Sequence, residues 1–331
     1  MIRVAINGFG RIGRMIFRAG YKDKDIEFVA FNDLTDTKTL AYLLKYDTSY
    51  RKFPGKIEAK SDSIIVDDKE YFVYAEKDPI NLPWKKLNVD VVIESTGLFL
   101  TRELASKHLK AGAKKVILSA PVKGSDTIKT IVRGVNENTL DKTKDDIISN
   151  ASCTTNCLAP MAKVLNDNFG IERAYMTTIH AITNDQGLVD SPHKDLMRGR
   201  AANHNMVITT SGATTAVAET IPDLKGKMDG ISIRVPIIVG SLTDFVAILK
   251  KPATKEKINW LFSEVSKYHM KGVLEYTEDP IVSSDIIGNE HSCIFDSLST
   301  MVNGNMVKIV GWYDNEWGYS NRMIDMIKLV I

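Results

Sequence analysis

Cys153 stands where a thiol can be activated for nucleophilic chemistry. It follows Ser152 in the segment SNASCTTNC, at a predicted change from strand to helix. Ser152 is a good N-cap, and Cys153 then lies in the first helical turn, where unpaired N–H groups and the helix dipole stabilise an anion. Such a position can lower a thiol pKa from about 8.5 to roughly 3.5–7.5. The segment predicts a reactive thiolate, although a cysteine at a helix start is more often a small buried residue.

We expect neither a disulfide nor a metal site at the other two cysteines, Cys157 and Cys293. Three cysteines cannot form a disulfide framework, and a free thiol fits a reducing, cytoplasmic compartment. Cys157 lies one helical turn after Cys153, where Cβ atoms about 5–6 Å apart are too distant for an unstrained disulfide. A zinc site would need two further ligands, and no cysteine or histidine cluster supplies them.

A second chemical signature stands at the start of the chain. Gly8, Gly10 and Gly13 match G-x-G-x-x-G directly after a predicted strand and at the start of a predicted helix. Gly8 permits the tight turn, Gly10 lets a pyrophosphate approach the backbone, and Gly13 allows close packing of helix on strand. Asp33 ends the next strand, where a carboxylate accepts hydrogen bonds from ribose hydroxyls and repels a 2′-phosphate. These residues predict a dinucleotide site that prefers NAD to NADP.

The elements around these residues indicate two kinds of domain. In the first half, apolar runs alternate with helical patterns, which predicts a mostly parallel sheet covered by helices. Strands are expected at 2–7, 26–33, 89–95, 114–120 and 146–150, helices at 11–20, 35–46 and 101–112, and a hairpin over 64–74 turning at Asp68-Lys69. In the second half, strands are expected within 172–181, 230–251, 291–297 and 305–314, and helices at 153–169, 214–224, 254–270 and 316–331.

We therefore expect an α/β Rossmann dinucleotide-binding domain and an α+β catalytic domain with a mainly antiparallel sheet. The predicted boundaries are 1–150 with 315–331 for the first domain and 151–314 for the second. The sequence has 43 Lys+Arg and 41 Asp+Glu, a net charge of +2. This charge predicts no broad basic surface for nucleic acid or an anionic membrane. No apolar run reaches the roughly 18 residues of a membrane span. Asn7 and Gly8 interrupt the first apolar run early, so we expect no secretory signal and a cytoplasmic protein.

Four motifs, INGFGRIGR, SNASCTTNCLAP, TTIHAITNDQ and WYDNEWGYSNR, occur in this order along the chain. Together they resemble the phosphorylating glyceraldehyde-3-phosphate dehydrogenases, and the resemblance covers the whole chain. It implies NAD-dependent conversion of glyceraldehyde 3-phosphate and inorganic phosphate to 1,3-bisphosphoglycerate, by a homotetramer. It also implies that Cys153 is the nucleophile, forming a thiohemiacetal and then a thioester. His180 matches the general base, a role that suits an imidazole with a pKa near 6.5.

The resemblance extends to the binding residues, which fall into two sets. The cofactor set is Asn7, Gly8, Gly10, Arg11, Ile12, Gly13, Asp33, Ser95, Thr96, Gly97, Ser119, Asn315 and Tyr319. For the substrate phosphate the match gives Thr183, Arg198 and Arg234, and for the attacking phosphate Ser152, Thr154, Ser211 and Gly212. Arg234 lies within an apolar strand, where an unpaired charge would be costly. The assignment of Arg198 is weaker, because Arg200 follows two residues later.

The chain departs from the family pattern at three places. Ile208 and Thr215 replace a proline and a lysine around the core Thr210-Ser211-Gly212, IIVGSLTDF (237–245) stands where many members have an Asn-Val-Ser-Val stretch, and Ile182 stands where tyrosine is common. None of these changes removes a group that the chemistry needs.

Two other functions compete with this interpretation. Erythrose-4-phosphate dehydrogenase is a sister enzyme with the same cysteine and histidine, but its members usually depart from the TNDQ stretch at 183–186. A nucleic-acid or surface-binding module could use the same fold without catalysis, yet the balanced charge and the intact catalytic set argue against it as the primary role.

Overall fold

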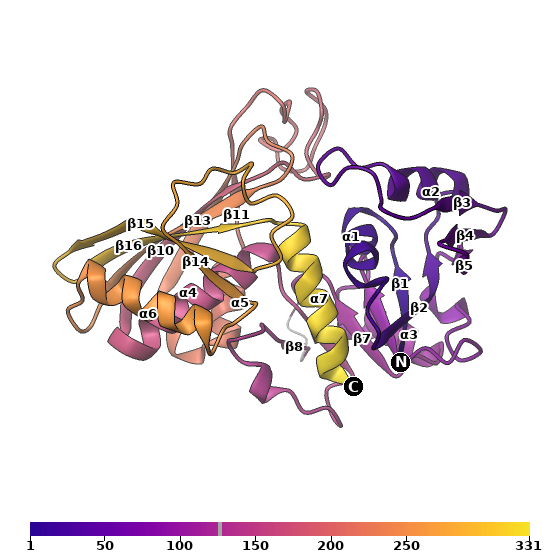
Figure 1. The fold of residues 1–331 in the computed structure, drawn as a ribbon, viewed down its shortest axis with the longest axis horizontal. Coiled ribbons are helices and arrows are strands. Elements are labelled where there is room, and N and C mark those ends of the chain that lie inside the picture. Colours follow the sequence, from indigo (N-terminus) through magenta and orange to yellow (C-terminus); the bar gives the residue numbers. More distant parts are fainter. Residues whose placement is uncertain (125–127) are drawn as a thin grey trace. The chain divides into compact units, whose positions relative to one another are not determined.

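The computed structural model describes residues 1–124 and 128–331, and in this part the chain forms two compact units. The first unit comprises Met1–Ile131, Asn138–Ala151 and Ser320–Ile331. The second comprises Val132–Glu137 and Ser152–Tyr319. Figure 1 labels the elements of both units along the chain. Each unit has its own sheet.

The first unit contains a nine-stranded sheet in the order β3-β4-β5-β2-β1-β6-β7-β9-β8. Its strands are β1 (Ile2–Asn7), β2 (Ile26–Asn32), β3 (Ile57–Ala59), β4 (Ser63–Val66), β5 (Lys69–Tyr74), β6 (Val91–Glu94), β7 (Lys115–Leu118), β8 (Lys129–Thr130) and β9 (Ile147–Ser149). Its helices are α1 (Arg11–Gly20), α2 (Thr37–Lys45) and α3 (Arg102–Lys110), and α7 (Trp317–Val330) lies mostly within this unit. All strand pairs are parallel except β3 with β4 and β4 with β5.

The centre of this sheet brings three polar residues to one edge. β1 pairs with β2 and with β6, so Asn7 lies beside Asn32 on one side and beside Glu94 on the other. Below this edge the strands are apolar on both faces, as a parallel sheet between helices requires. Phe9 and Phe31 stack there with ring centroids 4.0 Å apart. The predicted α/β Rossmann architecture is confirmed.

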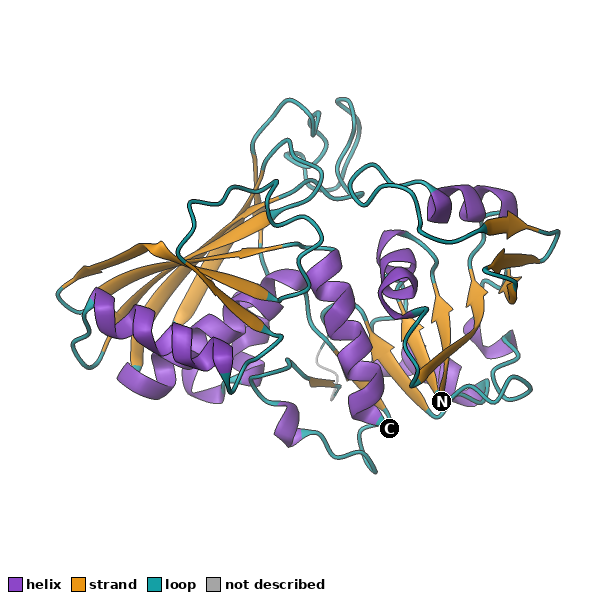
Figure 2. Cartoon of the chain, in the orientation of Figure 1, coloured by secondary structure: helices purple, strands orange, loops and turns teal. Residues whose placement is uncertain are grey.

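The second unit contains a seven-stranded sheet in the order β11-β12-β10-β13-β16-β15-β14. Its strands are β10 (Ile171–His180), β11 (Val207–Thr210), β12 (Met228–Arg234), β13 (Ser241–Leu249), β14 (Leu274–Thr277), β15 (Cys293–Asn303) and β16 (Met306–Tyr313). The helices α4 (Cys153–Phe169), α5 (Ala213–Thr220) and α6 (Lys255–Lys267) pack on this sheet (Figure 2). Only β10 with β12 and β14 with β15 pair in parallel, so the predicted mainly antiparallel sheet is confirmed.

The structure corrects several predicted element bounds. The hairpin turns at Asp67 and Asp68, whose φ angles are positive, rather than at Asp68-Lys69. The apolar stretch 230–251 is divided into β12 and β13, because residues 235–240 leave the sheet between them. Four strands, β3, β8, β11 and β14, have no counterpart in the sequence prediction. All four have only two to four residues, too few for a clear alternation of apolar and polar positions.

Candidate active site

Cys153 is the first residue of α4. The hydroxyl of Ser152 accepts a hydrogen bond from the N–H of Thr155, which confirms the predicted N-cap. Ala151, two residues before Cys153, has a φ of 53°, so the chain turns sharply into the helix. Cys153 is partly exposed, whereas Cys157 and Cys293 are buried, and all three thiols are free.

His180 ends β10 and faces the thiol. Its Nε2 atom lies 3.4 Å from the Sγ atom of Cys153. Its Nδ1 atom lies 2.7 Å from the carbonyl oxygen of Ala181, which can only accept a hydrogen bond. An imidazole that donates from Nδ1 to this oxygen leaves Nε2 bare and directed at Cys153. This is the arrangement of a nucleophile with its general base.

Arg234 is the charged group beside this pair. It ends β12, and the parallel register of β10 and β12 places it next to His180. Its Nη1 atom lies 2.7 Å from His180 Nδ1 and 3.2 Å from the Ala181 oxygen. Because a guanidinium can only donate, Arg234 donates to the Ala181 oxygen in the tautomer whose Nδ1 carries the proton, and to Nδ1 in the other tautomer. Arg234 is partly buried, and this burial lowers its pKa.

The protonation of the pair differs from the sequence prediction. Burial raises the pKa of Cys153 to about 11, although the charge of Arg234 and hydrogen bonds with Thr154 act in the opposite direction. Burial, followed by the charge of Arg234, lowers the pKa of His180 to about 3. Both shifts disfavour the thiolate that the helix N-terminus would stabilise, because burial acts against charge on either residue. Arg234 is the group that favours a thiolate beside a neutral imidazole.

Tyr313 supports the site, and sequence reasoning missed it. Its hydroxyl lies 2.9 Å from the hydroxyl of Thr154 and 2.8 Å from that of Thr178. Its ring stands edge-on to the ring of His180, with centroids 6.0 Å apart. Tyr313 thus ties the first turn of α4 to β10, which carries the histidine. Its place within the WYDNEWGYSNR motif was the available signal.

Two of the predicted phosphate residues meet at a carboxylate that the sequence did not single out. The hydroxyl of Thr183 and the guanidinium of Arg198 both donate to Asp185. Arg198 is largely buried and also pairs with Asp195 at 3.2 Å. Arg200 is exposed and pairs with Asp190, so Arg198 is the arginine held within the site. An anion that binds Thr183 and Arg198 has to share these donors with Asp185.

The residues predicted to bind the attacking phosphate lie at the N-termini of two helices that pack together. Ser152 and Thr154 flank the start of α4, and Thr154 is buried with its hydroxyl at Tyr313. Ser211 and Gly212 precede α5, which contacts α4. Of the departures from the family pattern, Thr215 is exposed on α5, Ile208 is exposed on β11, and Ile182 donates its N–H to the carbonyl of Ile237.

The glycine loop of the first unit fits a dinucleotide. A Cβ atom on Gly13 would lie 2.2 Å from the carbonyl oxygen of Gly8, so helix α1 can approach β1 only with glycine there. Gly10 caps α1 without a side-chain hydrogen bond, and a Cβ built on it meets no described atom within 4 Å. The helix N-terminus therefore offers N–H groups and space to a pyrophosphate. Asp33 accepts the N–H of Phe9 at 2.9 Å, which fixes its carboxylate beside the loop.

The other predicted cofactor residues are distributed over both units. In the first unit, Arg11 pairs with Asp47 at 2.9 Å, Ile12 is half-buried on α1, Ser95, Thr96 and Gly97 follow β6, and Ser119 follows β7. In the second unit, Asn315 accepts hydrogen bonds from the N–H of Gly240 and the hydroxyl of Ser241, both at 3.1 Å, and Tyr319 is buried.

Two features are absent from the part of the chain that the structure describes, residues 1–124 and 128–331. No group of three or more His, Cys, Asp or Glu side chains could hold a metal ion. No helix is long and apolar enough to cross a membrane.

Comparison with known proteins gives a consistent family. Residues 2–102 match the NAD-binding domain of glyceraldehyde 3-phosphate dehydrogenase, and residues 152–315 match its C-terminal domain. The chain is 56% identical over 331 residues to glyceraldehyde-3-phosphate dehydrogenase 2 of Streptomyces avermitilis, covering 99% of this chain and 98% of that protein. It is 53% identical to the enzyme of Geobacillus stearothermophilus, with 98% and 97% covered, and 55% identical to that of Thermotoga maritima, with 100% and 99% covered.

Proposed function

Because this chain belongs to the family of NAD-dependent glyceraldehyde-3-phosphate dehydrogenases, we propose that Cys153 and His180 carry out that reaction here. The substrate would be D-glyceraldehyde 3-phosphate, and the product 1,3-bisphosphoglycerate. The observation that carries the proposal is the 3.4 Å contact between the Sγ atom of Cys153 and the Nε2 atom of His180. A thiol and a base at this distance can exchange a proton directly.

The first half of the reaction builds a thioester on Cys153. His180 takes the thiol proton while the sulfur adds to the aldehyde carbon, and it returns a proton to the carbonyl oxygen to give a thiohemiacetal. The same Nε2 atom then removes the hydroxyl proton as hydride leaves the carbon, which converts the thiohemiacetal into a thioester. Bound NAD supplies the hydride acceptor. The N–H of Cys153 would donate to the oxygen on which charge develops.

The second half of the reaction releases the product. An oxygen of inorganic phosphate attacks the thioester carbon, the carbon–sulfur bond breaks, and the acyl phosphate leaves as the sulfur regains the proton from His180. Ser152, Thr154, Ser211 and Gly212 would hold the attacking phosphate, while Thr183, Arg198 and Arg234 would hold that of the substrate. Hydroxyls and N–H groups provide geometry in the first set, and arginines provide charge in the second.

Absorbance of NADH tests this proposal. We expect turnover with glyceraldehyde 3-phosphate and NAD that depends on added inorganic phosphate, and weaker turnover with erythrose 4-phosphate. Turnover of the triose that is indifferent to phosphate would contradict the phosphorolytic mechanism. RNA binding that survives Cys153→Ser, in a protein without dehydrogenase activity, would instead support a binding module.

Asp33→Ala should improve the use of NADP relative to NAD. The carboxylate at the end of β2 repels a 2′-phosphate, so its removal should change the ratio of kcat/KM values by roughly tenfold or more toward NADP. The measurement is kcat/KM for each cofactor at saturating triose and phosphate. Asp36→Ala, which removes the exposed N-cap of α2 nearby, is the matched control. An unchanged cofactor ratio would show that Asp33 does not contact the ribose.

We further propose that the protein forms a homotetramer through the uncovered face of the seven-stranded sheet. Strand register places exposed apolar side chains from five neighbouring strands on this face: Ile208, Ile231, Tyr175, Ile248 and Met306. Exposed apolar patches of this kind mark subunit contacts. Light scattering should give four times the 36.9 kDa of one chain, and Ile231→Lys should lower that mass. A monomer at micromolar concentration would contradict the proposal.

We also place the protein in the cytoplasm. All three cysteines are free in the structure, which suits a reducing compartment.

A further inference from the structure

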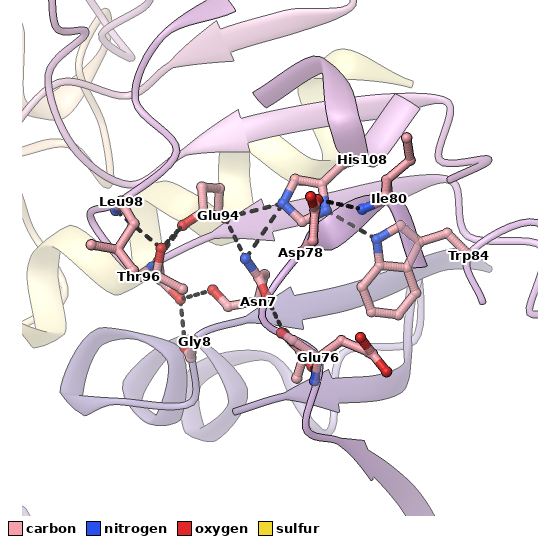
Figure 3. Close-up of polar contacts among 12 residues, drawn as sticks. Asn7, Gly8, Glu76, Asp78, Ile80, Trp84, Glu94, Thr96, Leu98 and His108 are labelled. Carbon is pink, nitrogen blue, oxygen red and sulfur yellow. Dashed lines mark hydrogen bonds and ion pairs between the residues drawn. The ribbon is translucent and has the colours of Figure 1, made fainter. Parts of the chain in front are cut away.

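A chain of buried polar side chains lies beneath the two loops of the first unit that follow β1 and β6. Glu94 ends β6, His108 lies on α3, and both side chains have no exposed surface. The Nε2 atom of His108 lies 3.0 Å from Oε2 of Glu94, and the indole Nε1 of Trp84 lies 3.0 Å from Nδ1 of the same ring. Figure 3 shows Trp84, His108, Glu94 and Asn7 in sequence. No motif in the sequence marks His108.

The hydrogen bonds of His108 fix which of its ring nitrogens carries the proton. An indole N–H can only donate, so Nδ1 of His108 must accept and carries no proton. The proton of the neutral ring is then on Nε2, which donates to Glu94. A doubly protonated His108 would direct an N–H at the N–H of Trp84. His108 is therefore a neutral imidazole in the Nε2–H form.

Glu94 is held as a carboxylate by four donors, none of which is a cation. Oε2 accepts from His108 and, at 2.5 Å, from the amide of Asn7. Oε1 accepts from the backbone N–H of Thr96 at 2.8 Å and from the Thr96 hydroxyl. A protonated carboxyl could not accept at all of these positions. A buried carboxylate is costly unless its lone pairs accept hydrogen bonds. Removing one donor should therefore destabilise the carboxylate and weaken its contacts with the remaining donors.

Through these contacts Glu94 fixes both loops. Thr96 belongs to the loop 95–97, and its N atom would be 2.8 Å from a Cβ on Gly8, so this loop packs directly on the glycine turn. The hydroxyl of Ser95 donates to the carbonyl oxygen of Gly8 at 2.6 Å. On the other side, Oδ1 of Asn7 accepts from Asn32 at 2.7 Å, which links β1 to the strand that ends next to Asp33.

We propose that Glu94 is a positioning residue for NAD, and that Trp84 and His108 set the orientation of its carboxylate. This inference rests on NAD binding at the glycine loop. Nearby, Asp78, labelled in Figure 3, accepts a hydrogen bond from Lys107 of α3 at 2.9 Å. The loops are thus held by one anionic group whose donors come from β1, α3 and the 95–97 loop itself.

Three variants test the proposal through the Kd for NAD. His108→Leu removes the donor to Glu94 and should weaken NAD binding by roughly tenfold or more. His108→Gln can accept from Trp84 with its oxygen and donate to Glu94 with its amide, so it should restore most of the affinity. Glu94→Gln has one oxygen for four donors and should bind as poorly as His108→Leu. Glu103→Gln, at an exposed position of α3, is the control and should bind like the parent.

A spectroscopic measurement separates positioning from mere stability. In the parent protein, ¹⁵N-labelled His108, assigned by its loss in His108→Gln, should show a bare Nδ1 and a protonated Nε2. An imidazolium, or the Nδ1–H form, would overturn the proposal, as would equal NAD affinity in the parent and His108→Leu. A parent protein that fails to bind NAD would instead contradict the proposed function. Thermal melts of each variant show whether it is folded.

Discussion

Cys153→Ser is expected to lower kcat by at least about a thousandfold, because removing a covalent nucleophile usually costs several orders of magnitude. A serine hydroxyl beside His180 is a weaker nucleophile and a poorer leaving group than the thiol, so both formation and phosphorolysis of the acyl intermediate suffer. The Kd for NAD should stay within about threefold, since the glycine loop belongs to the other unit. The measurements are NADH production at saturating substrates and equilibrium binding of NAD.

Cys157→Ser is the matched control for this variant. Cys157 lies one turn further along α4, is fully buried, and its Sγ atom lies 3.6 Å from the carbonyl oxygen of Gly311. This substitution leaves Cys153 and His180 in place, so the variant should retain activity even if it melts at a lower temperature. Retention of a tenth of the parental kcat by Cys153→Ser would refute the nucleophile assignment.

Local patterns in the sequence were sufficient to predict most of the helices and strands. The run from Ile2 to Asn7 and the helix that starts at Cys153 have the predicted bounds, because apolar periodicity and caps act over a few residues. Short strands such as β11 form only because a neighbouring strand supplies their hydrogen bonds. Val207 pairs with Arg234, and no pattern within four residues could reveal that pairing.

The chemistry of the site was predicted less completely, because it depends on contacts between distant residues. Cys153 and His180 were found through motifs, but the raised pKa of the thiol comes from burial, which the sequence does not state. Tyr313 reaches Thr154 across 159 positions of the chain. Glu94 and His108 have no spacing that a motif would show, since the end of a strand and the face of a helix bring them together.

His180→Asn should lower kcat by roughly a hundredfold to ten-thousandfold, the usual contribution of a general base. Asparagine can still hydrogen-bond to the Ala181 carbonyl, so the local structure should persist while the proton acceptor at Nε2 is lost. In the parent, the lowered pKa of His180, about 3, keeps the imidazole neutral and able to accept a proton throughout the neutral range. The parental rate should therefore change little between about pH 7 and 8.5.

The rate of His180→Asn should instead rise with pH. Without a base the thiolate must form by loss of a proton to solvent, and the raised pKa of Cys153, about 11, leaves little thiolate at neutral pH. Each added pH unit below that pKa increases the thiolate about tenfold, so the variant's rate should climb steeply while the parent's does not. His269→Gln, an exposed position after α6, is the control and should follow the parent profile. A His180→Asn profile as flat as the parental one would mean that another group removes the thiol proton.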